Sequence, residues 1–554
     1  MTTEAPLDVG ALVDADQGLF TWLGAAAGAH PDRLVVRGRY GDAEVEVTLA
    51  QLEATSRRVA GGLAALGVGE DSTIGAWLPN RVEWAITQFA CAALGAGVLG
   101  LNTRYRSHEL SHLLQTVHVS ALVLPSSFLG IDFLGTLESA YRSIRDLDPA
   151  FVAPTLVFVG AVPDGAGPIA SGALSFEDLV RSAPVDGVVD HGPAISNLFT
   201  TSGSTSAPKV AGHDQASILR HAIAGARALD VRADDRILAV LPLCGVFGFS
   251  AVMAVVVGGG AAVMMETFDA DEGARMLEEL AVTHVVGGDE MLGAIFSRVP
   301  ETSSLASLRR GGIANFAGRS KEVVAQADRR WGAKISGVYG SSELFALSAL
   351  WPADAGVERR GLGGGLVVDP GIEVRVRDLD TGEPVADGDP GELQFRGYNV
   401  TPGYLNNDRA NAASFTSDGW FRTGDLGYLA HGGFVYQCRA REALRLRGFL
   451  VEPGEIEDYL SEEPSIDEVH VVGVETDQGT RAFAFARPRP GSAIDEADIL
   501  GRARTRVASY KVPERLLSVA EFPTTTGTNG TKVRFEELRA WARDHLGAPS
   551  EEST

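Results

Sequence analysis

The chain of 554 residues carries 72 acidic and 48 basic side chains, which gives a formal net charge of −24 at pH 7. We expect neither nucleic acid nor an anionic membrane as a partner, because most of the surface would repel both; an anionic small molecule needs only a local positive site. Apolar residues make up 45% of the chain and charged residues 22%, as in an ordinary globular protein, and the length predicts about three or four domain-sized units.

The sequence has no pattern for export or for metal binding by cysteine. Residues 1–8 have neither a basic region nor an apolar core, so we expect no signal peptide. Cys91, Cys244 and Cys438 are widely spaced, which indicates neither a disulfide framework nor a zinc site. We therefore expect a protein of the reducing cytoplasm.

Helical and strand patterns alternate along residues 1–190. Apolar residues recur at helical spacing in some segments and form short continuous runs, typical of buried strands, in others. The helical segments are 49–66, 82–94 and 107–115, and the strand segments are 73–77, 95–101 and 120–124. Strands that alternate with helices indicate a parallel sheet covered by helices, so the expected fold class is α/β.

Residues 200–209 have the composition of a loop that binds an anion. They include six hydroxyl side chains together with Gly203, Pro208 and Lys209. Backbone N–H groups around a glycine, hydroxyl groups and a lysine can together surround phosphate oxygens. A Ser/Gly linker is the alternative. The loop, however, follows a strand pattern at 194–199 and precedes a helical pattern, which is where α/β folds place anion sites.

Lysine is scarce, since only five of the 48 basic residues are lysines, and Lys209 is one of them. A lysine retained in such a loop favours a countercharge for phosphate over a surface role. The phosphate-binding residues that we expect are Thr201, Ser202, Gly203, Ser204, Thr205 and Lys209.

Residues 237–265 are long enough to span a membrane and carry no charge. Pro242 and several glycines interrupt the run, and no basic cluster flanks it. We interpret it as a strand, a loop, a buried helix and a second strand inside an α/β core, and we expect no membrane span.

The loop at 200–209 resembles the T-S-G-T-T-G-x-P-K-G loop of the AMP-forming adenylating enzymes. This superfamily includes acyl-CoA synthetases, the adenylation domains of nonribosomal peptide synthetases and firefly luciferase. Ser204, Ser206 and Val210 depart from the pattern. Residues 101–110 and several later segments resemble the same superfamily, in the same order along the chain.

The resemblance implies a two-domain architecture. The large N-terminal domain, 1–439, would combine helix-covered parallel sheets with a distorted barrel and would bind ATP and the acid. The small α+β C-terminal domain, 440–554, would be mobile and would carry the catalytic lysine.

Residues 338–343 resemble the Y-G-x-T-E segment of the superfamily, with Ser342 in place of threonine. Taken alone, the hexapeptide could be an ordinary turn, but its place after a strand pattern at 333–338 favours a site. A tyrosine face can stack on a base, and a carboxylate supplies the hard oxygen that Mg²⁺ prefers. The resemblance implies Val338, Tyr339 and Gly340 for the nucleotide, Ser342 for phosphate and Glu343 for Mg²⁺.

Residues 419–427 give the strongest single match, to the G-W-x-x-T-G-D segment of the same enzymes. A carboxylate in a glycine-flanked turn can accept hydrogen bonds from two vicinal hydroxyls. The resemblance therefore implies that Asp425 binds the ribose of the nucleotide. The alternative is an aspartate that stabilises its own turn.

Residues 438–457 resemble the hinge of the superfamily and the segment after it. The resemblance implies that Arg439 contacts the nucleotide, that Arg441 occupies the hinge position, usually Asp or Lys, and that Gly448 lines the pantetheine tunnel. Arg445 falls where many relatives carry a lysine. A basic pair of surface strands would explain the arginines equally well.

Residues 522–532 resemble the glycine-rich loop with which these enzymes deliver a lysine to the reacting carboxylate and α-phosphate. Most relatives have P-x-T-x-x-G-K, and the loop is longer here. Lys532 is the expected counterpart. The catalytic residues implied by the resemblance are Lys532, Glu343, Ser342 and Arg439.

The expected acid pocket departs furthest from the superfamily pattern. Residues 241–248 resemble P-L-F-H-x-x-G, but Gly245 replaces the histidine, and residues 286–291 differ from the usual P-P. Asp289 could cap a helix or recognise a substrate amine or hydroxyl. The expected pocket residues are Gly245, Phe247, Gly287, Gly288, Asp289, Ala314 and Ser341, and Asn315 and Phe316 are expected to contact the nucleotide.

The resemblance implies an enzyme that uses ATP, Mg²⁺ and CoA to activate a carboxylic acid, and the pattern is closest to ligases of cyclohexanecarboxylate, medium-chain and aryl acids. The altered loop and hinge and the missing histidine keep another acceptor in view: an amine, a carrier-protein thiol, or nitrite as in ATP-dependent diazotases. A degenerate nucleotide-binding scaffold is disfavoured because the expected charged residues are present. We expect a monomer or a homodimer.

Overall fold

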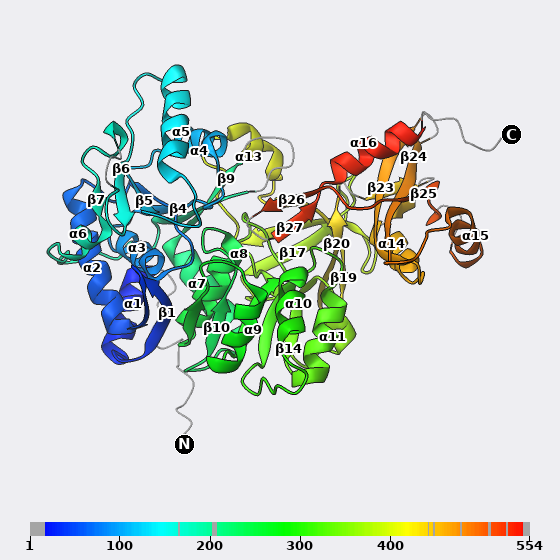
Figure 1. Cartoon of the computed structure of the whole chain (residues 1–554), viewed down its shortest axis with the longest axis horizontal. Helices are drawn as coiled ribbons and strands as arrows, with labels where there is room; N and C mark the ends of the chain where they lie inside the picture. The colour runs from blue at the N-terminus through cyan, green and yellow to red at the C-terminus, as the bar shows by residue number, and fades with distance from the viewer. Residues whose placement is uncertain are drawn as a thin grey trace. The chain divides into compact units, whose positions relative to one another are not determined.

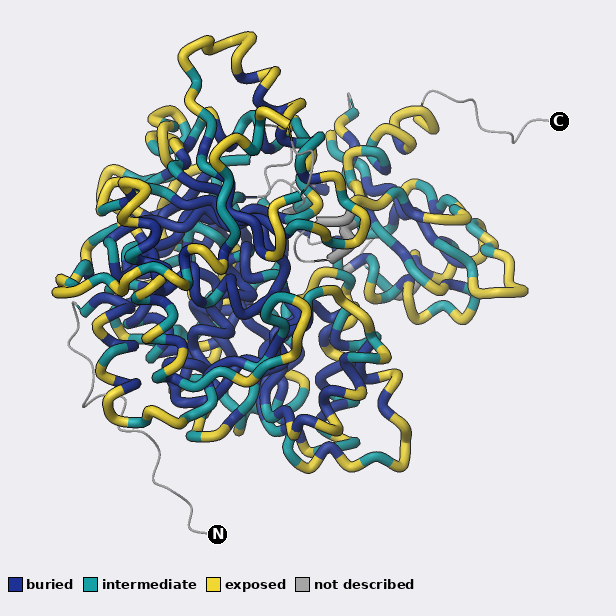
Figure 2. The backbone as a smooth tube through the Cα atoms, turned by 60° about the vertical axis from the view of Figure 1, so that its left-hand side comes forward, coloured by how far each residue is buried: buried dark blue, intermediate teal, exposed yellow. Residues whose placement is uncertain are grey.

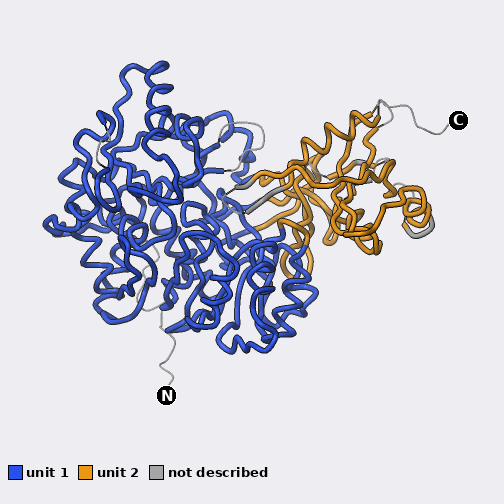
Figure 3. Tube along the Cα trace, viewed as in Figure 1, with its two compact units in different colours: residues 1–315, 319–373, 395–421 blue, residues 316–318, 374–394, 422–554 orange. Residues whose placement is uncertain are grey.

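The computed structural model describes residues 17–163, 167–201, 208–440, 443–446, 449–451, 453–476, 479–507, 511–527 and 530–546. The chain forms two compact units (Figure 3). The first comprises residues 1–315, 319–373 and 395–421, and the second comprises residues 316–318, 374–394 and 422–554. These units are defined by packing. The sequence predicts a different division, into a large domain at 1–439 and a small mobile domain at 440–554. That division stays a prediction.

The first unit contains a seven-stranded sheet in the order β7-β6-β5-β3-β4-β8-β9 (Figure 1). Its neighbouring strands are parallel except for β8 and β9, which pair antiparallel. The strands are β3 (Thr73–Ala76), β4 (Gly97–Gly100), β5 (Ala121–Pro125), β6 (Thr155–Val159), β7 (Leu174–Ser175), β8 (Ile195–Thr200) and β9 (Val210–Asp214). The helices are α2 (Leu49–Ala65), α3 (Val82–Ala93), α4 (Ser107–Thr116), α5 (Phe133–Leu147) and α6 (Phe176–Val180). The predicted alternation of helices and strands is confirmed.

A second sheet of the first unit has the order β16-β15-β14-β13-β12-β10-β11-β1-β2. From β14 to β1 the neighbouring strands are parallel, and the outer pairs are antiparallel. The strands are β1 (Leu34–Tyr40), β2 (Ala43–Thr48), β10 (Arg236–Ala239), β11 (Ala261–Met264), β12 (His284–Gly288), β13 (Arg310–Ala314), β14 (Lys334–Tyr339), β15 (Ala349–Leu350) and β16 (Gly364–Val367). The helices are α1 (Leu19–Ala29), α7 (Gln215–Ala228), α8 (Val246–Val257), α9 (Ala270–Glu279), α10 (Asp289–Arg298), α11 (Ser320–Trp331), α12 (Val357–Arg360) and α13 (Asp408–Ser414).

The uncharged run at 237–265 forms β10, a loop, α8 and β11, as predicted. Every residue of α8 is buried, which explains why the helix has no polar face. Among the described residues, no helix combines the length and the hydrophobicity that a membrane span needs.

The buried residues fill the interior of the first unit (Figure 2). Three phenylalanines join its two sheets: Phe199 on β8, Phe249 on α8 and Phe345 after β14. Their ring centroids lie 5.6 to 6.1 Å apart. Complete burial of one such side chain stabilises a fold by about 1.5–3 kcal/mol, so this cluster fixes the segment after β14 against both sheets.

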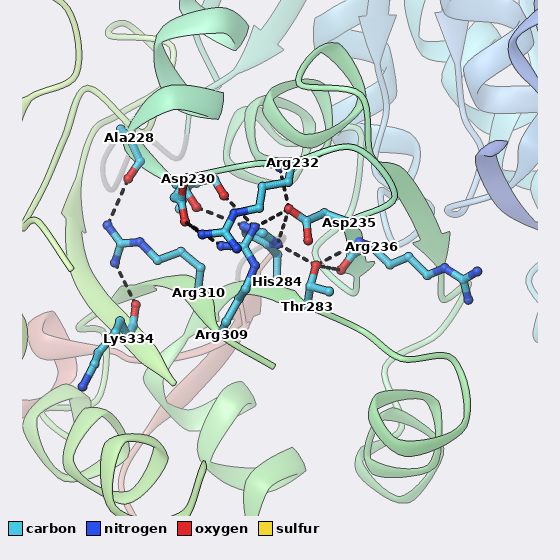
Figure 4. A network of polar contacts seen from close by, with 11 residues as sticks. Ala228, Asp230, Arg232, Asp235, Arg236, Thr283, His284, Arg309, Arg310 and Lys334 are labelled. Carbon is cyan, nitrogen blue, oxygen red and sulfur yellow. Dashed lines mark hydrogen bonds and ion pairs between the residues drawn. The ribbon is translucent and has the colours of Figure 1, made fainter. Parts of the chain in front are cut away.

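A polar network joins the amino ends of β10, β12 and β13 (Figure 4). Arg309 pairs with the buried carboxylate of Asp235, and its Nη1 donates to Asp230 Oδ2 at 2.9 Å. The hydroxyl of Thr283 lies 2.7 Å from Nδ1 of His284, whose pKa is lowered by burial. Because all of these residues except Asp230 lie at or next to the start of a strand, the network holds the amino ends of the three strands together.

The second unit begins with strands in the order β17-β18-β19-β20 and continues with a three-stranded sheet, β23-β24-β25. Its strands are β17 (Ile372–Arg377), β18 (Gly391–Gly397), β19 (Phe421–Ala430), β20 (Gly433–Arg439), β21 (Leu444–Leu446), β22 (Phe449–Val451), β23 (Ile466–Thr476), β24 (Gly479–Pro488), β25 (Arg515–Ser518), β26 (Thr524–Gly527) and β27 (Gly530–Val533), and its helices are α14 (Pro453–Ser461), α15 (Glu496–Arg506) and α16 (Phe535–Leu546). β17, β18 and β19 each include residues of both units at their ends. The predicted α/β class with a separate small α+β unit is confirmed.

Candidate active site

Four neighbouring parallel strands of the second sheet end at the same edge. Their order is β14-β13-β12-β10, and Gly288 at the end of β12 lies opposite Ala314 at the end of β13. Tyr339 ends β14, and Gly245 lies in the loop after β10. Ligands of open α/β sheets bind outside the carboxyl ends of the strands. The sheet therefore brings together the segments that the sequence predicts for the nucleotide and the acid.

The β8–β9 hairpin of the other sheet supports the expected phosphate loop. Thr201 N donates to Lys209 O at 2.8 Å and closes the base of the loop. On the strand leading in, Thr200 Oγ1 lies 2.7 Å from the hydroxyl of Tyr105. Just before the strand leading out, the carbonyl of Pro208 accepts a hydrogen bond from His112 Nε2 at 2.9 Å. Four of the expected phosphate ligands lie outside the described residues: Ser202, Gly203, Ser204 and Thr205.

The segment after β14 meets this hairpin. Ser342 Oγ donates to Thr200 O at 3.4 Å, and His213 Nε2 on β9 donates to Ser342 O at 2.8 Å. Burial lowers the pKa of His213 to about 4, so its imidazole is neutral near pH 7. The neutral imidazole therefore holds the segment after β14 without adding a second positive charge that would compete with Lys209 for phosphate.

The backbone of this segment tolerates little change. A Cβ on Gly340 would lie 2.5 Å from Ala346 Cα, so only glycine fits there. Phe345, Ala346 and Leu347 have φ of 56°, 47° and 37°, in the left-handed region that costs a residue with a Cβ about 1–2 kcal/mol. His221 Nε2 donates to Ala346 O at 3.0 Å, and burial of Phe345 offsets part of that cost.

Tyr404 connects the expected metal ligand with the expected phosphate lysine. Its hydroxyl donates to Glu343 Oε1 at 2.7 Å, and Lys209 Nζ lies 3.9 Å from the centroid of its ring. Thr401 N, three residues earlier, donates to Glu343 O at 2.7 Å. The sequence prediction missed Tyr404, because its place depends on a bridge to Ala211 on β9, far away in the chain.

Two buried hydroxyls at this site fit a bound anion. Thr201 Oγ1 and Ser341 Oγ are buried, and neither has a hydrogen-bond partner among the described residues. Buried polar groups are almost always hydrogen-bonded, so such atoms indicate a missing ligand. Together with Lys209 and the carboxylate of Glu343, they suit a polyphosphate accompanied by Mg²⁺, which often takes one or two protein carboxylates and completes its shell with phosphates.

In the second unit, the structure brings together two residues that the sequence predicts for the nucleotide. Asp425 on β19 lies opposite Arg439 on β20, and Arg439 Nη1 is 2.9 Å from Asp425 Oδ1. The carboxylate of Asp425 is buried, and Asp425 N also bonds Thr423 Oγ1 at 3.0 Å. A buried carboxylate held by an arginine is preoriented for hydroxyl donors.

Two family models match the chain. One, described as AMP-binding enzyme, matches residues 23–405, and the other, described as AMP-binding enzyme C-terminal domain, matches residues 455–529. The chain belongs to the AMP-binding enzyme family. It is an adenylate-forming enzyme.

Individual relatives agree with the assignment. The chain is 31% identical to the indoleacetate–CoA ligase of Aromatoleum aromaticum, over 94% of this chain and 97% of that protein. Its fold is similar to that of ATP-bound MatB from Rhodopseudomonas palustris, with a TM-score of 0.81, 23% identity and coverage of 96% and 100% of the two chains. The amide bond synthetase McbA from Marinactinospora thermotolerans gives a TM-score of 0.76 at 22% identity, over 92% and 97% of the chains. At these identities the two structures support the fold alone.

The expected acid pocket of this AMP-binding enzyme lies at the same strand ends. Gly287 and Gly288 are buried at the end of β12, and Phe247 is buried on α8 just after Gly245. Both oxygens of Asp289 accept backbone hydrogen bonds: Oδ1 from Glu290 N at 3.0 Å and Oδ2 from Arg319 N at 2.7 Å. Asp289 is the first residue of α10 and Arg319 precedes α11, so these bonds connect the starts of the two helices.

The remaining predicted residues are placed as follows. Asn315 Oδ1 accepts from Ser320 N at 3.3 Å, at the start of α11, and Phe316 belongs to the second unit and is 42% exposed. Val338 and Tyr339 are buried at the end of β14. Arg445 lies on β21 opposite Leu450, Lys532 lies on β27 opposite Thr525, and Arg441 and Gly448 lie outside the described residues.

Proposed function

We propose that this AMP-binding enzyme is an ATP-dependent acid–CoA ligase that activates an aryl, alicyclic or medium-chain carboxylic acid. The observation that carries the proposal is the meeting of the β8–β9 hairpin with the segment after β14, where the hydroxyl of Ser342 bonds Thr200 O and the carbonyl of Ser342 accepts from His213. This contact supports a phosphate site at the hairpin, next to the Glu343 carboxylate, which is of the kind that holds Mg²⁺. The similarity to an indoleacetate–CoA ligase supports an aryl acid and a CoA acceptor.

The chemistry begins with a poor electrophile. A carboxylate oxygen attacks the α-phosphorus of ATP, pyrophosphate leaves, and the acid becomes a mixed anhydride with AMP. Negative charge builds up on the phosphate oxygens in this displacement, so positioned cations and N–H or O–H donors lower its barrier. Thr201 and Lys209 are the first unit's candidates for these donors, and Lys532 is the candidate from the second unit. Mg²⁺, held through Glu343, would neutralise part of the phosphate charge.

The anhydride then reacts with an acceptor, and CoA is the acceptor that we propose. Asp425 and Arg439, which are paired at 2.9 Å, would bind the ribose and the nucleotide before and after the transfer. Arg441 is the proposed pivot for the rotation of residues 440–554 that would exchange Lys532 for the CoA thiol.

A second candidate keeps the adenylation and changes the acceptor. Gly245, at the amino end of α8, offers no side chain at a position where acyl-CoA synthetases usually carry a histidine. An amine, a carrier-protein thiol or nitrite could then take the acyl group or react with the activated acid.

One experiment separates the candidates. The full chain is incubated with ATP, Mg²⁺ and a panel of aryl, alicyclic, medium-chain and aminoaryl acids, and pyrophosphate release is measured with CoA, with nitrite, with an amine or with no acceptor. We expect turnover with at least one acid to require CoA. Turnover only with nitrite or an amine would support the second candidate, and no acid-dependent pyrophosphate release with any acceptor would contradict both.

A further inference from the structure

The side chain of Tyr404 contacts two opposite charges from different directions. Its hydroxyl, at the edge of the ring, donates to Glu343 Oε1 at 2.7 Å, and Lys209 Nζ lies over the face of the ring, 3.9 Å from the centroid. Tyr404 is 4% exposed, whereas Lys209 and Glu343 are both partly exposed. The ring is therefore a buried support beneath two groups that can still reach a ligand.

The backbone around Tyr404 holds the ring in place. Tyr404 N donates to Asn411 Oδ1 at 2.6 Å, and Asn411 Nδ2 donates back to Tyr404 O at 3.0 Å. The next residue, Leu405, donates its N–H to the carbonyl of Val210 at 2.9 Å, and Val210 directly follows Lys209 in the chain. These bonds fix the phenol relative to β9, the strand that begins directly after the lysine.

Lys209 and Glu343 do not pair with each other. Among the residues that the structure describes, neither takes part in an ion pair, and Tyr404 contacts both. A direct pair would cancel both charges and would compete with phosphate for the ammonium and with Mg²⁺ for the carboxylate. A neutral phenol orients each group without cancelling its charge, because the ring attracts a cation and the hydroxyl donates to an anion.

We infer that Tyr404 is a positioning residue that separates Lys209 from Glu343 and so keeps the ammonium available to ATP and the carboxylate available to Mg²⁺. The inference rests on the proposed function, in which Lys209 binds phosphate and Glu343 binds the metal.

The test measures binding of ATP to the full-length protein by calorimetry, with Mg²⁺ and with EDTA. Tyr404→Phe keeps the ring and removes the hydroxyl, so we expect the affinity for MgATP to fall about tenfold, while the affinity for ATP in EDTA stays within about twofold of wild type. Tyr404→Leu removes the spacer and lets Lys209 and Glu343 pair. We expect its affinity for ATP to fall about tenfold or more in both conditions.

A double variant separates this role from general support of the fold. If Tyr404→Leu weakens ATP binding in EDTA because Glu343 captures Lys209, then adding Glu343→Gln removes the competitor and should restore that affinity to within about threefold of wild type. A merely structural loss would not be rescued by a change at Glu343. Circular dichroism melts of each variant identify those that fail to fold, and Tyr404→Phe is the variant least affected by packing.

Tyr398 provides a matched control. Arg220 Cζ lies 4.0 Å from the centroid of its ring, and its hydroxyl is 3.4 Å from His221 Nδ1, so Tyr398 also joins a cation to a hydrogen bond. Neither Arg220 nor Tyr398 belongs to the proposed nucleotide site. We expect Tyr398→Phe to bind ATP like wild type in both conditions.

The outcomes distinguish the inference from the proposed function. If Lys209→Met and Glu343→Gln weaken MgATP binding but both Tyr404 variants bind like wild type, the inference is wrong and the proposed function stands. If neither Lys209→Met nor Glu343→Gln weakens binding, the roles given to these residues in the proposed function fail. Equal losses with Mg²⁺ and with EDTA in Tyr404→Phe, or no rescue of Tyr404→Leu by Glu343→Gln, would also contradict the inference.

Discussion

Acidification from pH 7 to pH 5 is expected to destabilise the first unit through two histidines that hold the segment after β14. His213 Nε2 donates to Ser342 O and His221 Nε2 donates to Ala346 O. Burial lowers the pKa of each imidazole to about 4, from the usual 6.5. The unfolded chain therefore binds protons that the folded unit excludes, so stability falls as the pH drops from about 6.5 towards 4.

The size of the effect follows from the two pKa values. At pH 5, a histidine with a pKa of about 4 in the folded state and about 6.5 in the unfolded state costs about 2 kcal/mol, so His213 and His221 together cost about 4 kcal/mol. Typical proteins are stable by about 5–15 kcal/mol. The loss is therefore large enough to be measured easily.

Urea denaturation followed by tryptophan fluorescence reports on the first unit, because all tryptophans except Trp541 lie there. We expect His221→Gln, which cannot be protonated, to reduce the loss in unfolding free energy between pH 7 and pH 5 by about 2 kcal/mol. His108→Gln, at an exposed position on α4, serves as the control and should leave the loss unchanged. A wild-type protein equally stable at both pH values, or a loss unaffected by His221→Gln, would refute the reasoning.

Three further changes test other parts of the molecule. Lys532→Ala should slow adenylation by about 10²–10³-fold, measured as acid-dependent pyrophosphate exchange, and near-normal exchange would remove Lys532 from the reaction. Gly340→Ala, whose Cβ would lie 2.5 Å from Ala346 Cα, should cost about 1–3 kcal/mol of stability and weaken MgATP binding, and a variant that melts and binds like wild type would show that the segment can adjust. Burial alone would lower the pKa of His470, but its bonds to Glu457 and Glu468 raise the pKa to about 9. The stability that the charged imidazole contributes is therefore present below about pH 6.5. It is lost as the pH rises through 9, by about 3 kcal/mol in all. His470→Gln should flatten that alkaline loss in urea titrations of the second unit, and an unchanged loss would contradict this role.

Local patterns predicted some of the strand ends that build the site. The runs before Thr200 and Tyr339 are apolar and short, and the polar or glycine-rich residues after them mark where each strand stops. The strand patterns before Thr200 and Tyr339 and at the start of 237–265 correspond to β8, β14 and β10. No strand pattern was identified for β12 or β13, and their ends were expected at the site only through the resemblance. The elements within 237–265 could be predicted because the proline and glycines divide this run into segments of ordinary length.

Contacts between distant segments could not be predicted in this way. Tyr404 reaches Glu343 and Lys209 only because residues 401–405 pair with β9, and no local pattern records that pairing. His213 has the surroundings of an ordinary core residue in the sequence, yet its imidazole supports the carbonyl of Ser342. The extent of the second unit could not be predicted for the same reason. Residues 374–394 belong to it only because their strands pair with residues after 421.

The transfer of oxygen from the acid to AMP tests the central claim most directly. A carboxylic acid labelled with ¹⁸O, chosen from those that support pyrophosphate release, is incubated with the full-length protein, ATP, Mg²⁺ and CoA, and the AMP is analysed by mass spectrometry. Attack of the carboxylate on the α-phosphorus predicts AMP that carries one ¹⁸O atom and unlabelled pyrophosphate. AMP without label, or label in phosphate or pyrophosphate, would contradict the account.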